Sequence, residues 1–195
     1  MAPLPLTLFG TLEPAVTASA RFERTDLDET AWVDVARDVL VGADTLLDAL
    51  VEQLPFTQGR RYMYDEWVDE PRLSCPLELS EGPAVVRSLA NFFTRTYGVK
   101  FDSCFVNYYR NGDDSVAWHS DRIGRTVAHP LVAIVSLGGP RRFGMRRKGG
   151  GASWRFVLGS GDALVMGGGC QHRFEHSVPK MKYAAPRISL SFRHH

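Results

Sequence analysis

Near its C-terminus the chain carries the run Arg187-Ile188-Ser189-Leu190-Ser191-Phe192-Arg193, in which polar and apolar residues alternate without exception. Side chains two residues apart on a β-strand point to the same face, so this period predicts a strand. One face would carry Ile188, Leu190 and Phe192 into a hydrophobic core. The other face would carry two guanidinium groups and two hydroxyl groups.

The sequence before this run predicts further strands, preceded by helices. Short β-rich segments are separated by Gly, Pro, Asp or Asn, which favour turns. They cover residues 103–110, 116–119, 131–137, 142–146, 154–158, 163–166, 174–178 and 188–192. Apolar residues at helical spacing predict helices over 43–53 and 82–97. This order predicts an α+β, mainly β fold, a double-stranded β-helix (jelly roll) braced by two N-terminal helices.

Composition predicts one soluble domain. The 195 residues suffice for one good core, and 44% hydrophobic with 23% charged residues is ordinary for a globular domain. We expect a loosely ordered N-terminal arm over 1–20 and a single domain over 21–195. No apolar run has the length of a membrane span, and the start of the chain does not read as a signal peptide. Three widely spaced cysteines indicate reduced thiols, and we expect a cytoplasmic monomer.

The net charge of +1 hides an asymmetry along the chain. Acids dominate residues 23–52, whereas residues 122–161 contain no acid. Such a basic stretch can contact phosphates, although a solvated surface explains it equally well. Its cations are Arg122, Arg125, Arg141, Arg142, Arg146, Arg147, Lys148 and Arg155.

The triplet His119-Ser120-Asp121 predicts two ligands of a metal ion. If the local strand is regular, His119 and Asp121 share a face, and His176 on a distant strand is the natural third ligand. Two imidazoles and one carboxylate leave positions open on Fe(II) for substrate and oxygen, while zinc accepts the same set. A chance His-x-Asp pair at the surface is the alternative. The remaining histidines lie in loops or at the end of the chain: His129, His172, His194 and His195.

The polar face of the 188–192 strand predicts an anion site. Two arginines inside a barrel are costly unless an anion compensates them, and a dicarboxylate pairs well with guanidinium groups. Asn107 and Tyr109 share a face of the 103–110 strand and can add hydrogen bonds. The alternative is an amphipathic edge strand with its arginines in solvent.

Several ordered motifs together resemble the AlkB family of Fe(II)- and 2-oxoglutarate-dependent dioxygenases. The resemblance runs from about Tyr62 to Arg193 and is densest from Asn107. Its blocks are Asn107-Tyr108-Tyr109-Arg110-Asn111-Gly112, Val116-Ala117-Trp118-His119-Ser120-Asp121, Ser136-Leu137-Gly138, Arg142-Phe143, Met145-Arg146-Arg147-Lys148, Ser160-Gly161-Asp162, His176-Ser177-Val178-Pro179 and the closing Arg-x-x-Leu-Ser-Phe-Arg.

The resemblance implies a role for each matching residue. It implies His119, Asp121 and His176 as iron ligands. It implies a nucleotide-recognition lid over 56–75. The implied 2-oxoglutarate contacts are Asn107, Tyr109, Arg187, Ser191 and Arg193. The implied base contacts are Tyr62 and Tyr64. The basic run Arg146, Arg147 and Lys148 can serve as a phosphate track, and Arg122, where the sequence departs from the family, can contact a phosphate or a carbonyl of a base. An ordinary half-buried strand is the alternative for the two tyrosines.

The activity that the resemblance implies is oxidative demethylation of alkylated bases in DNA or RNA, with Fe(II), 2-oxoglutarate and O2 consumed and formaldehyde and succinate released. A base must then leave the stack or come from a single strand. Two positions depart from the family pattern: Arg122-Ile123-Gly124 follows Asp121 where repair members commonly carry an acid, and Ser189 stands where Asn is usual. The alternatives are an oxygenase for a protein or small molecule, and a non-catalytic nucleic-acid-binding module on the same fold.

Overall fold

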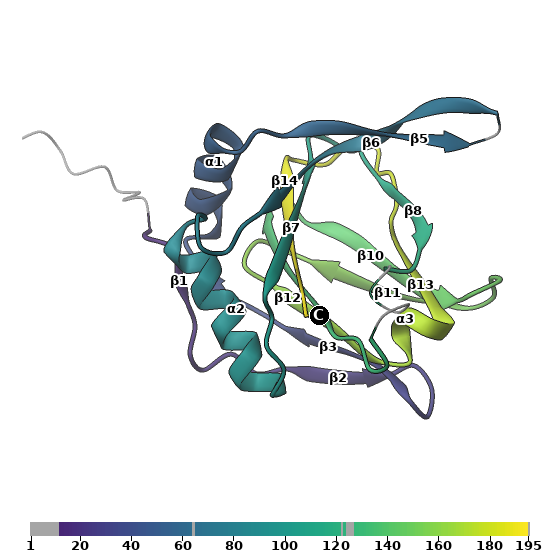
Figure 1. Cartoon of the computed structure of the whole chain (residues 1–195), viewed down its shortest axis with the longest axis horizontal. Helices are drawn as coiled ribbons and strands as arrows, with labels where there is room; N and C mark the ends of the chain where they lie inside the picture. Colours follow the sequence, from purple (N-terminus) through teal and green to yellow (C-terminus); the bar gives the residue numbers. More distant parts are fainter. Residues whose placement is uncertain (1–11, 64, 122, 124–126, 195) are drawn as a thin grey trace, which may run out of the picture.

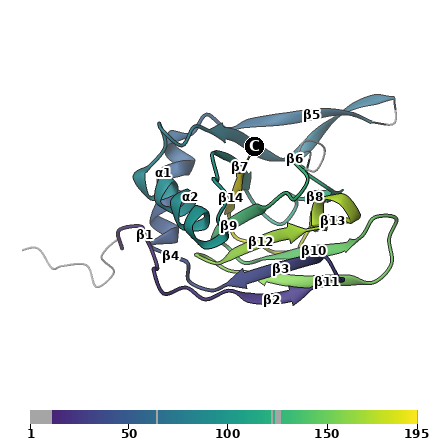
Figure 2. The same ribbon diagram turned by 60° about the horizontal axis from the view of Figure 1, so that its bottom comes forward.

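The computed structural model describes residues 12–63, 65–121, 123 and 127–194, and its core is two facing antiparallel sheets (Figure 1). The larger sheet has eight strands in the order β2-β3-β12-β9-β14-β7-β6-β5, and the smaller has four in the order β11-β10-β13-β8. Figure 2 shows the same arrangement from a second direction. The larger sheet contains β2 (Glu23–Asp26), β3 (Ala31–Ala36), β5 (Thr57–Met63), β6 (Glu66–Leu77), β7 (Ser103–Tyr109), β9 (Val132–Gly138), β12 (Ala163–Gly168) and β14 (Arg187–Arg193). The smaller contains β8 (Val116–His119), β10 (Arg141–Arg147), β11 (Ser153–Leu158) and β13 (Phe174–Val178). The predicted mainly β jelly roll is confirmed.

The C-terminal strand β14 lies inside the larger sheet, between β7 and β9. Residues 187–192 are all buried, so the alternative of an edge strand in solvent is wrong. Ile188, Leu190 and Phe192 join the core beneath the helices, as the alternation predicts. The opposite face of β14 therefore points between the two sheets.

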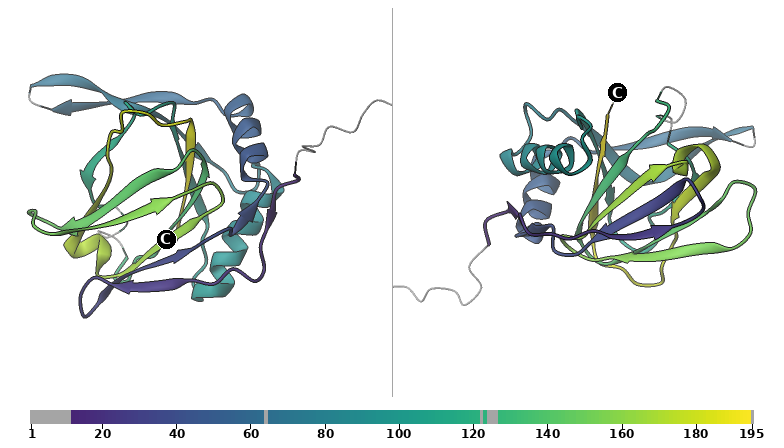
Figure 3. Two further views of the ribbon diagram at one scale, coloured as in Figure 1. Left: turned by 180° about the vertical axis from the view of Figure 1, so that it is seen from behind. Right: turned by 90° about the horizontal axis from the view of Figure 1, so that it is seen from below.

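Two helices cover the outer face of the larger sheet, α1 (Ala43–Gln53) and α2 (Ala84–Tyr97). Leu50 of α1 and Phe93 of α2 are fully buried in the same core cluster as Phe192. Helix α2 begins after Pro83 rather than at residue 82, and it ends at Gly98, whose φ of 71° favours glycine. The views in Figure 3 keep both helices together on one side of the barrel. The predicted bracing by two helices is confirmed.

The β5–β6 hairpin forms the far edge of the larger sheet and runs past the end of the barrel (Figures 1 and 3). Only the second part of β6, from Leu73 to Leu77, pairs with β7. The first part pairs with β5 alone. This hairpin coincides with the predicted lid over 56–75. The twelve-residue strand β6 was not predicted, because its polar first half does not alternate.

The chain outside the two sheets adds small elements. Ala15–Val16 (β1) pairs with Leu40–Val41 (β4), so part of the predicted arm over 1–20 is ordered, while residues 1–11 lie outside the described residues. A single-turn helix, α3 (Cys170–Arg173), precedes β13. The cysteines are free and buried, in line with the predicted thiols. Among the described helices, none combines the length and apolar character needed to cross a membrane.

Candidate metal and co-substrate centre

The predicted metal ligands lie close together on and just beyond β8 and on its neighbour β13 in the smaller sheet. His119 is the last residue of β8, and His176 faces it directly in the register of β13. Their ring centroids are 4.2 Å apart. Ligand atoms of His119, Asp121 and His176 all lie within 4.8 Å of one another, a spacing that one metal ion can bridge. The sequence prediction that these three side chains converge is confirmed.

Asp121 lies beyond the end of β8, and three hydrogen bonds fix the loop that carries it. Ser120 Oγ donates to the Phe174 carbonyl at 2.6 Å, and the Asp121 N–H donates to Gln171 Oε1 at 2.8 Å. Arg193 Nη2 donates to Asp121 Oδ1 at 2.9 Å. Burial alone would raise the pKa of Asp121, but the nearby His176, Arg193 and His119 outweigh it and hold that pKa below its usual range. The carboxylate is therefore ionised and ready to bind a cation.

Both imidazoles are held in place by their surroundings. His119 Nδ1 lies 2.9 Å from the Ala117 carbonyl, which can only accept, so Nδ1 carries the proton and the Nε2 lone pair is free. His176 is 6% exposed and stacks on Phe143 at 5.4 Å. Burial lowers the pKa of His176 to about 3, so its ring is neutral at physiological pH. Neutral imidazole is the form that binds metals.

Arg187 lies on the inner face of β14, and one nitrogen of its guanidinium group has no hydrogen-bond partner among the described residues. It is 1% exposed, and its Nε donates to Ser136 Oγ at 2.8 Å. Its Nη1 is buried and has no hydrogen-bond partner among the described residues. Burial lowers the pKa of Arg187 below its ordinary value. A buried guanidinium with an unpaired nitrogen is a site that a carboxylate would complete.

Tyr109 lies between two buried arginines. The guanidinium carbons of Arg187 and Arg141 are 5.2 Å and 5.3 Å from its ring centroid. Burial raises the pKa of Tyr109 against the opposing effect of these cations, so its hydroxyl stays protonated. It can therefore donate a hydrogen bond to an anion beside Arg187.

Arg141 is a residue whose position the sequence did not reveal. It was counted with the basic stretch, yet it is 1% exposed. Its guanidinium donates to the carbonyls of Asn111, Asp114 and Pro179, at 3.1, 2.7 and 2.9 Å. It thereby ties the loop after β7 and the loop after β13 to the inner site. No local pattern could have shown this, because its partners lie far away in sequence.

The remaining predicted 2-oxoglutarate contacts line the same inner face. Asn107 lies opposite Ser189 in the register of β7 and β14, and its Oδ1 accepts from Arg72 Nε at 2.9 Å. Ser191 is 5% exposed on the face shared with Arg187. Arg193 is bonded to the metal ligand Asp121, as described above. The five predicted residues thus share one face of the neighbouring strands β7 and β14, and Arg193 links this face to the metal ligand Asp121.

Of the predicted base contacts, Tyr62 is described and Tyr64 lies outside the described residues. Tyr62 is 58% exposed on β5 and contacts Trp67 of β6 edge to face, with centroids 5.7 Å apart. Trp67 is 60% exposed and was not predicted. An exposed aromatic pair on a projecting hairpin gives a surface on which a base can stack. The sequence signal for Trp67 was its place three residues after Tyr64 in the lid.

The predicted phosphate contacts have partners within the protein. Arg146 Nε donates to Glu175 Oε1 at 2.6 Å, and its guanidinium lies 4.2 Å from the Trp118 ring centroid. Arg147 is paired with Asp28, and Lys148 donates to the Gln171 carbonyl. Arg122 lies outside the described residues. Within the described part of the basic stretch, Arg142 and Arg155 are exposed on neighbouring strands.

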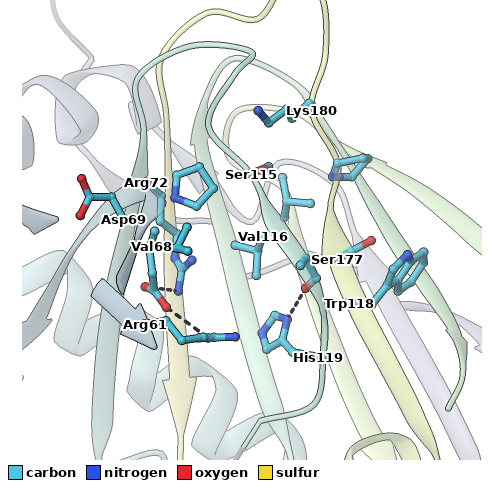
Figure 4. A pocket seen from close by; sticks show the side chains of 15 residues that line it. Arg61, Val68, Asp69, Arg72, Ser115, Val116, Trp118, His119, Ser177 and Lys180 are labelled. Carbon is cyan, nitrogen blue, oxygen red and sulfur yellow. Dashed lines mark hydrogen bonds and ion pairs between the residues drawn. The ribbon is translucent and has the colours of Figure 1, made fainter. Parts of the chain in front are cut away.

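A cavity of about 270 Å³ opens between the hairpin and β8 (Figure 4). Its lining comes from β6, from β8 as far as His119, and from the end of β13 with the loop that follows. Arg61 reaches across it towards His119 in Figure 4. The cavity therefore joins the exposed hairpin to one face of the metal-binding cluster.

Comparison with known proteins shows the family to which this chain belongs. The model of the 2OG-Fe(II) oxygenase superfamily matches residues 43–193, so the chain belongs to this superfamily. Human alpha-ketoglutarate-dependent dioxygenase alkB homolog 3 is 31% identical over 174 residues, covering 77% of this chain and 61% of that protein. Human DNA oxidative demethylase ALKBH2 is 26% identical over 190 residues, covering 83% of this chain and 73% of that protein. The AlkB resemblance is thus confirmed, although the chain spans less than two thirds of the length of alkB homolog 3.

Solved structures support the fold. OsALKBH1 has a TM-score of 0.60 at 15% identity, covering 89% of this chain and all of that one. A 2OG-Fe(II) oxygenase family protein from Burkholderia pseudomallei has a TM-score of 0.51 at 16% identity, covering 76% of each chain.

The residues present fit the cofactors of the superfamily, Fe(II) and 2-oxoglutarate. Two imidazoles and one carboxylate are the ligand set of non-haem Fe(II) oxygenases. The buried, unpaired Nη1 of Arg187 suits a carboxylate of the co-substrate. Zinc, which the ligand set alone allowed, is not the metal of this superfamily.

Proposed function

We propose that this chain is an Fe(II)- and 2-oxoglutarate-dependent dioxygenase that removes N-methyl groups from alkylated bases in DNA or RNA. The observation that carries the proposal is the cavity that joins the exposed aromatic hairpin to His119. The names of the relatives, a dioxygenase and a DNA oxidative demethylase, support the same reading.

The residues of the site would have distinct roles in this activity. His119, Asp121 and His176 would hold the metal, and Arg187 would pair with a carboxylate of the co-substrate. When bound, iron and 2-oxoglutarate would supply, with O2 as the oxidant, the chemistry that converts an N-methyl group to formaldehyde, with succinate and carbon dioxide as the co-products. The fixed ligands and the buried inner face keep the reacting groups in place and limit water.

Access to the metal requires the base to leave its neighbours. A base stacked in a duplex cannot reach a cluster inside a barrel, so it must be flipped out or come from a single strand. Tyr62 and Trp67 offer aromatic faces on which bases stack, and Arg142 and Arg155 are exposed cations for the phosphate backbone. Arg146, Arg147 and Lys148 would contact phosphates only by exchanging their present partners.

The experiment is anaerobic loading with Fe(II) and 2-oxoglutarate, then oxygen, with a panel of methylated DNA and RNA oligonucleotides. We expect succinate and formaldehyde in equal amounts and loss of one methyl mass from at least one oligonucleotide. Succinate with every oligonucleotide unchanged would favour a protein or small-molecule substrate. No succinate under any condition would favour the non-catalytic module.

The cytoplasmic location and the monomeric state of the protein stay predictions. The predicted location rests on the free thiols.

A further inference from the structure

The cavity beside His119 is lined by more cations than acids. Arg61, Arg72 and Lys180 contribute positive charges, and Asp69 and Glu70 contribute negative ones. Asp69 pairs with Arg60, which lies outside the lining, at 3.1 Å. Glu70 is therefore the acid that decides whether the cavity can accommodate a further cation.

Glu70 is held by two guanidinium groups at once. Its Oε1 lies 3.1 Å from Arg61 Nη2, and its Oε2 lies 3.0 Å from Arg72 Nη2. Arg72 is itself anchored to Asn107 of β7. The carboxylate lies over Gly59, where a Cβ would come within 2.8 Å of Oε2. A cationic ligand would have to displace an arginine in order to reach Glu70.

The other wall of the cavity adds no acid. The lining residues of that wall, 115–119 and 177–180, include no Asp or Glu, and the acids that flank them, Asp121 and Glu175, are paired with Arg193 and Arg146. Lys180 has no ion-pair partner among the described residues and lines the same cavity. Charge repulsion is weakly screened in a partly desolvated cavity, so a positively charged base is disfavoured there.

We propose that this cavity selects uncharged, carbonyl-bearing alkylated bases over cationic ones, with Arg61 as a specificity-determining residue. The proposal rests on the proposed function. Thymine methylated at N3 is neutral and keeps two carbonyl acceptors, which guanidinium and ammonium donors can bind. Cytosine methylated at N3 carries a positive charge at neutral pH and presents an amino group. The two bases place the N-methyl group at the same ring position, and they differ in charge, in the polar group at C4 and in the C5 methyl group of thymine.

Arg61 and Arg60 form a matched pair for the test. Both lie on β5, their side chains are 55% and 60% exposed, and each makes an ion pair to β6 at 3.1 Å. Only Arg61 lines the cavity. Arg61→Gln removes one positive charge from the cavity and frees Glu70 Oε1, whereas Arg60→Gln changes the hairpin surface outside it.

The experiment uses the full chain and two single-stranded oligonucleotides that differ only in 3-methylthymine or 3-methylcytosine at one position. The first readout is the ratio of kcat/KM for the two lesions. The second is the ratio of Kd values, measured by fluorescence anisotropy without oxygen. We expect the wild type to favour 3-methylthymine and Arg61→Gln to shift both ratios about tenfold towards 3-methylcytosine. Arg60→Gln should keep the wild-type ratios.

The outcomes separate this inference from the function on which it rests. Wild-type preference for 3-methylcytosine, or equal ratios in Arg61→Gln and Arg60→Gln, overturns the charge selection while demethylation itself stands. Turnover of neither lesion, with tight binding to neither, overturns this inference, and the proposed function falls with it only if the whole panel of methylated oligonucleotides is also left unchanged. The shift in Arg61→Gln alone supports both.

Discussion

Side chains between the two sheets are buried and bonded to one another, whereas those of the β5–β6 hairpin stand largely in solvent. Arg141 and Arg187 in the interior are 1% exposed, while the side chains of Arg60 and Arg61 on the hairpin are more than half exposed. Arginine therefore occurs in two different environments in this protein. Packing and hydrogen bonds fix the interior arginines, whereas the hairpin arginines make exposed ion pairs that can exchange partners.

This difference in burial leads us to expect different roles for the interior and for the hairpin. The interior would set which reaction occurs, because its geometry is over-determined by packing and hydrogen bonds. The hairpin would set which molecule enters, because exposed ion pairs are weak and can change without unfolding the barrel. Changes in the interior should therefore alter cofactor binding or stability, and changes on the hairpin should alter substrate binding alone.

The largest effect is expected from Arg187→Gln. Removing the guanidinium that would pair with a co-substrate carboxylate should raise the Kd for 2-oxoglutarate about 30-fold or more, because breaking a buried charge pair costs about 2–5 kcal/mol. Calorimetric titration with 2-oxoglutarate and Mn(II) in place of Fe(II) measures this. Arg187→Lys keeps the charge and should give an intermediate Kd. An unchanged Kd in Arg187→Gln would remove this residue from the co-substrate site.

Arg141→Met tests whether the interior also holds the loops together. It leaves the carbonyls of Asn111, Asp114 and Pro179 without this donor, and we expect the free energy of unfolding to fall by about 2–3 kcal/mol. Arg142→Met, at the exposed neighbouring position on β10, is the control and should change it by less than about 0.5 kcal/mol. Urea unfolding compares the two variants. Equal losses would erase the distinction between interior and surface arginines.

Trp67→Ala and Tyr62→Ala test the hairpin. Loss of one stacking surface should weaken single-stranded oligonucleotide binding by about 1–2 kcal/mol, while 2-oxoglutarate affinity stays the same. Tyr183→Ala is the control, since Tyr183 is an 80% exposed aromatic on the loop after β13. Fluorescence anisotropy measures the binding. If all three variants bind equally well, the hairpin is not the stacking surface.

The smallest effect concerns Asp114 and pH. Burial would raise the pKa of this carboxyl, but hydrogen bonds from Arg110 outweigh it and hold the pKa below the ordinary 3.8. The folded state then binds fewer protons than the unfolded state, so this contribution is present above pH 3.8 and is lost as the pH falls through the folded value. Asp114→Asn should lower stability by about 1 kcal/mol near pH 6 and by less at about pH 3. Parallel stability losses at both pH values would contradict this role.

Local patterns predicted the interior better than the hairpin. Strict alternation placed both faces of β14, because strand geometry fixes side-chain direction. The His-x-Asp spacing with a later histidine also found the metal ligands, although Asp121 lies beyond the end of β8 and is held there by hydrogen bonds. Side-chain contacts between segments that are distant in the sequence leave no local pattern from which they could be predicted. The burial of Arg141, the partner Glu175 of Arg146 and the Arg61–Glu70–Arg72 group all depend on contacts across strands. The polar first half of β6 is a strand only because β5 pairs with it.

The central claim is that His119, Asp121 and His176 form one iron site beside a co-substrate pocket. Its most direct test is anaerobic titration of the protein with Fe(II) in the presence of 2-oxoglutarate, followed by visible charge-transfer absorption of the chelate. We expect saturation at one iron per chain in the wild type, and neither absorption nor iron retention in a folded His176→Ala variant. The same absorption and stoichiometry in both proteins would contradict the claim.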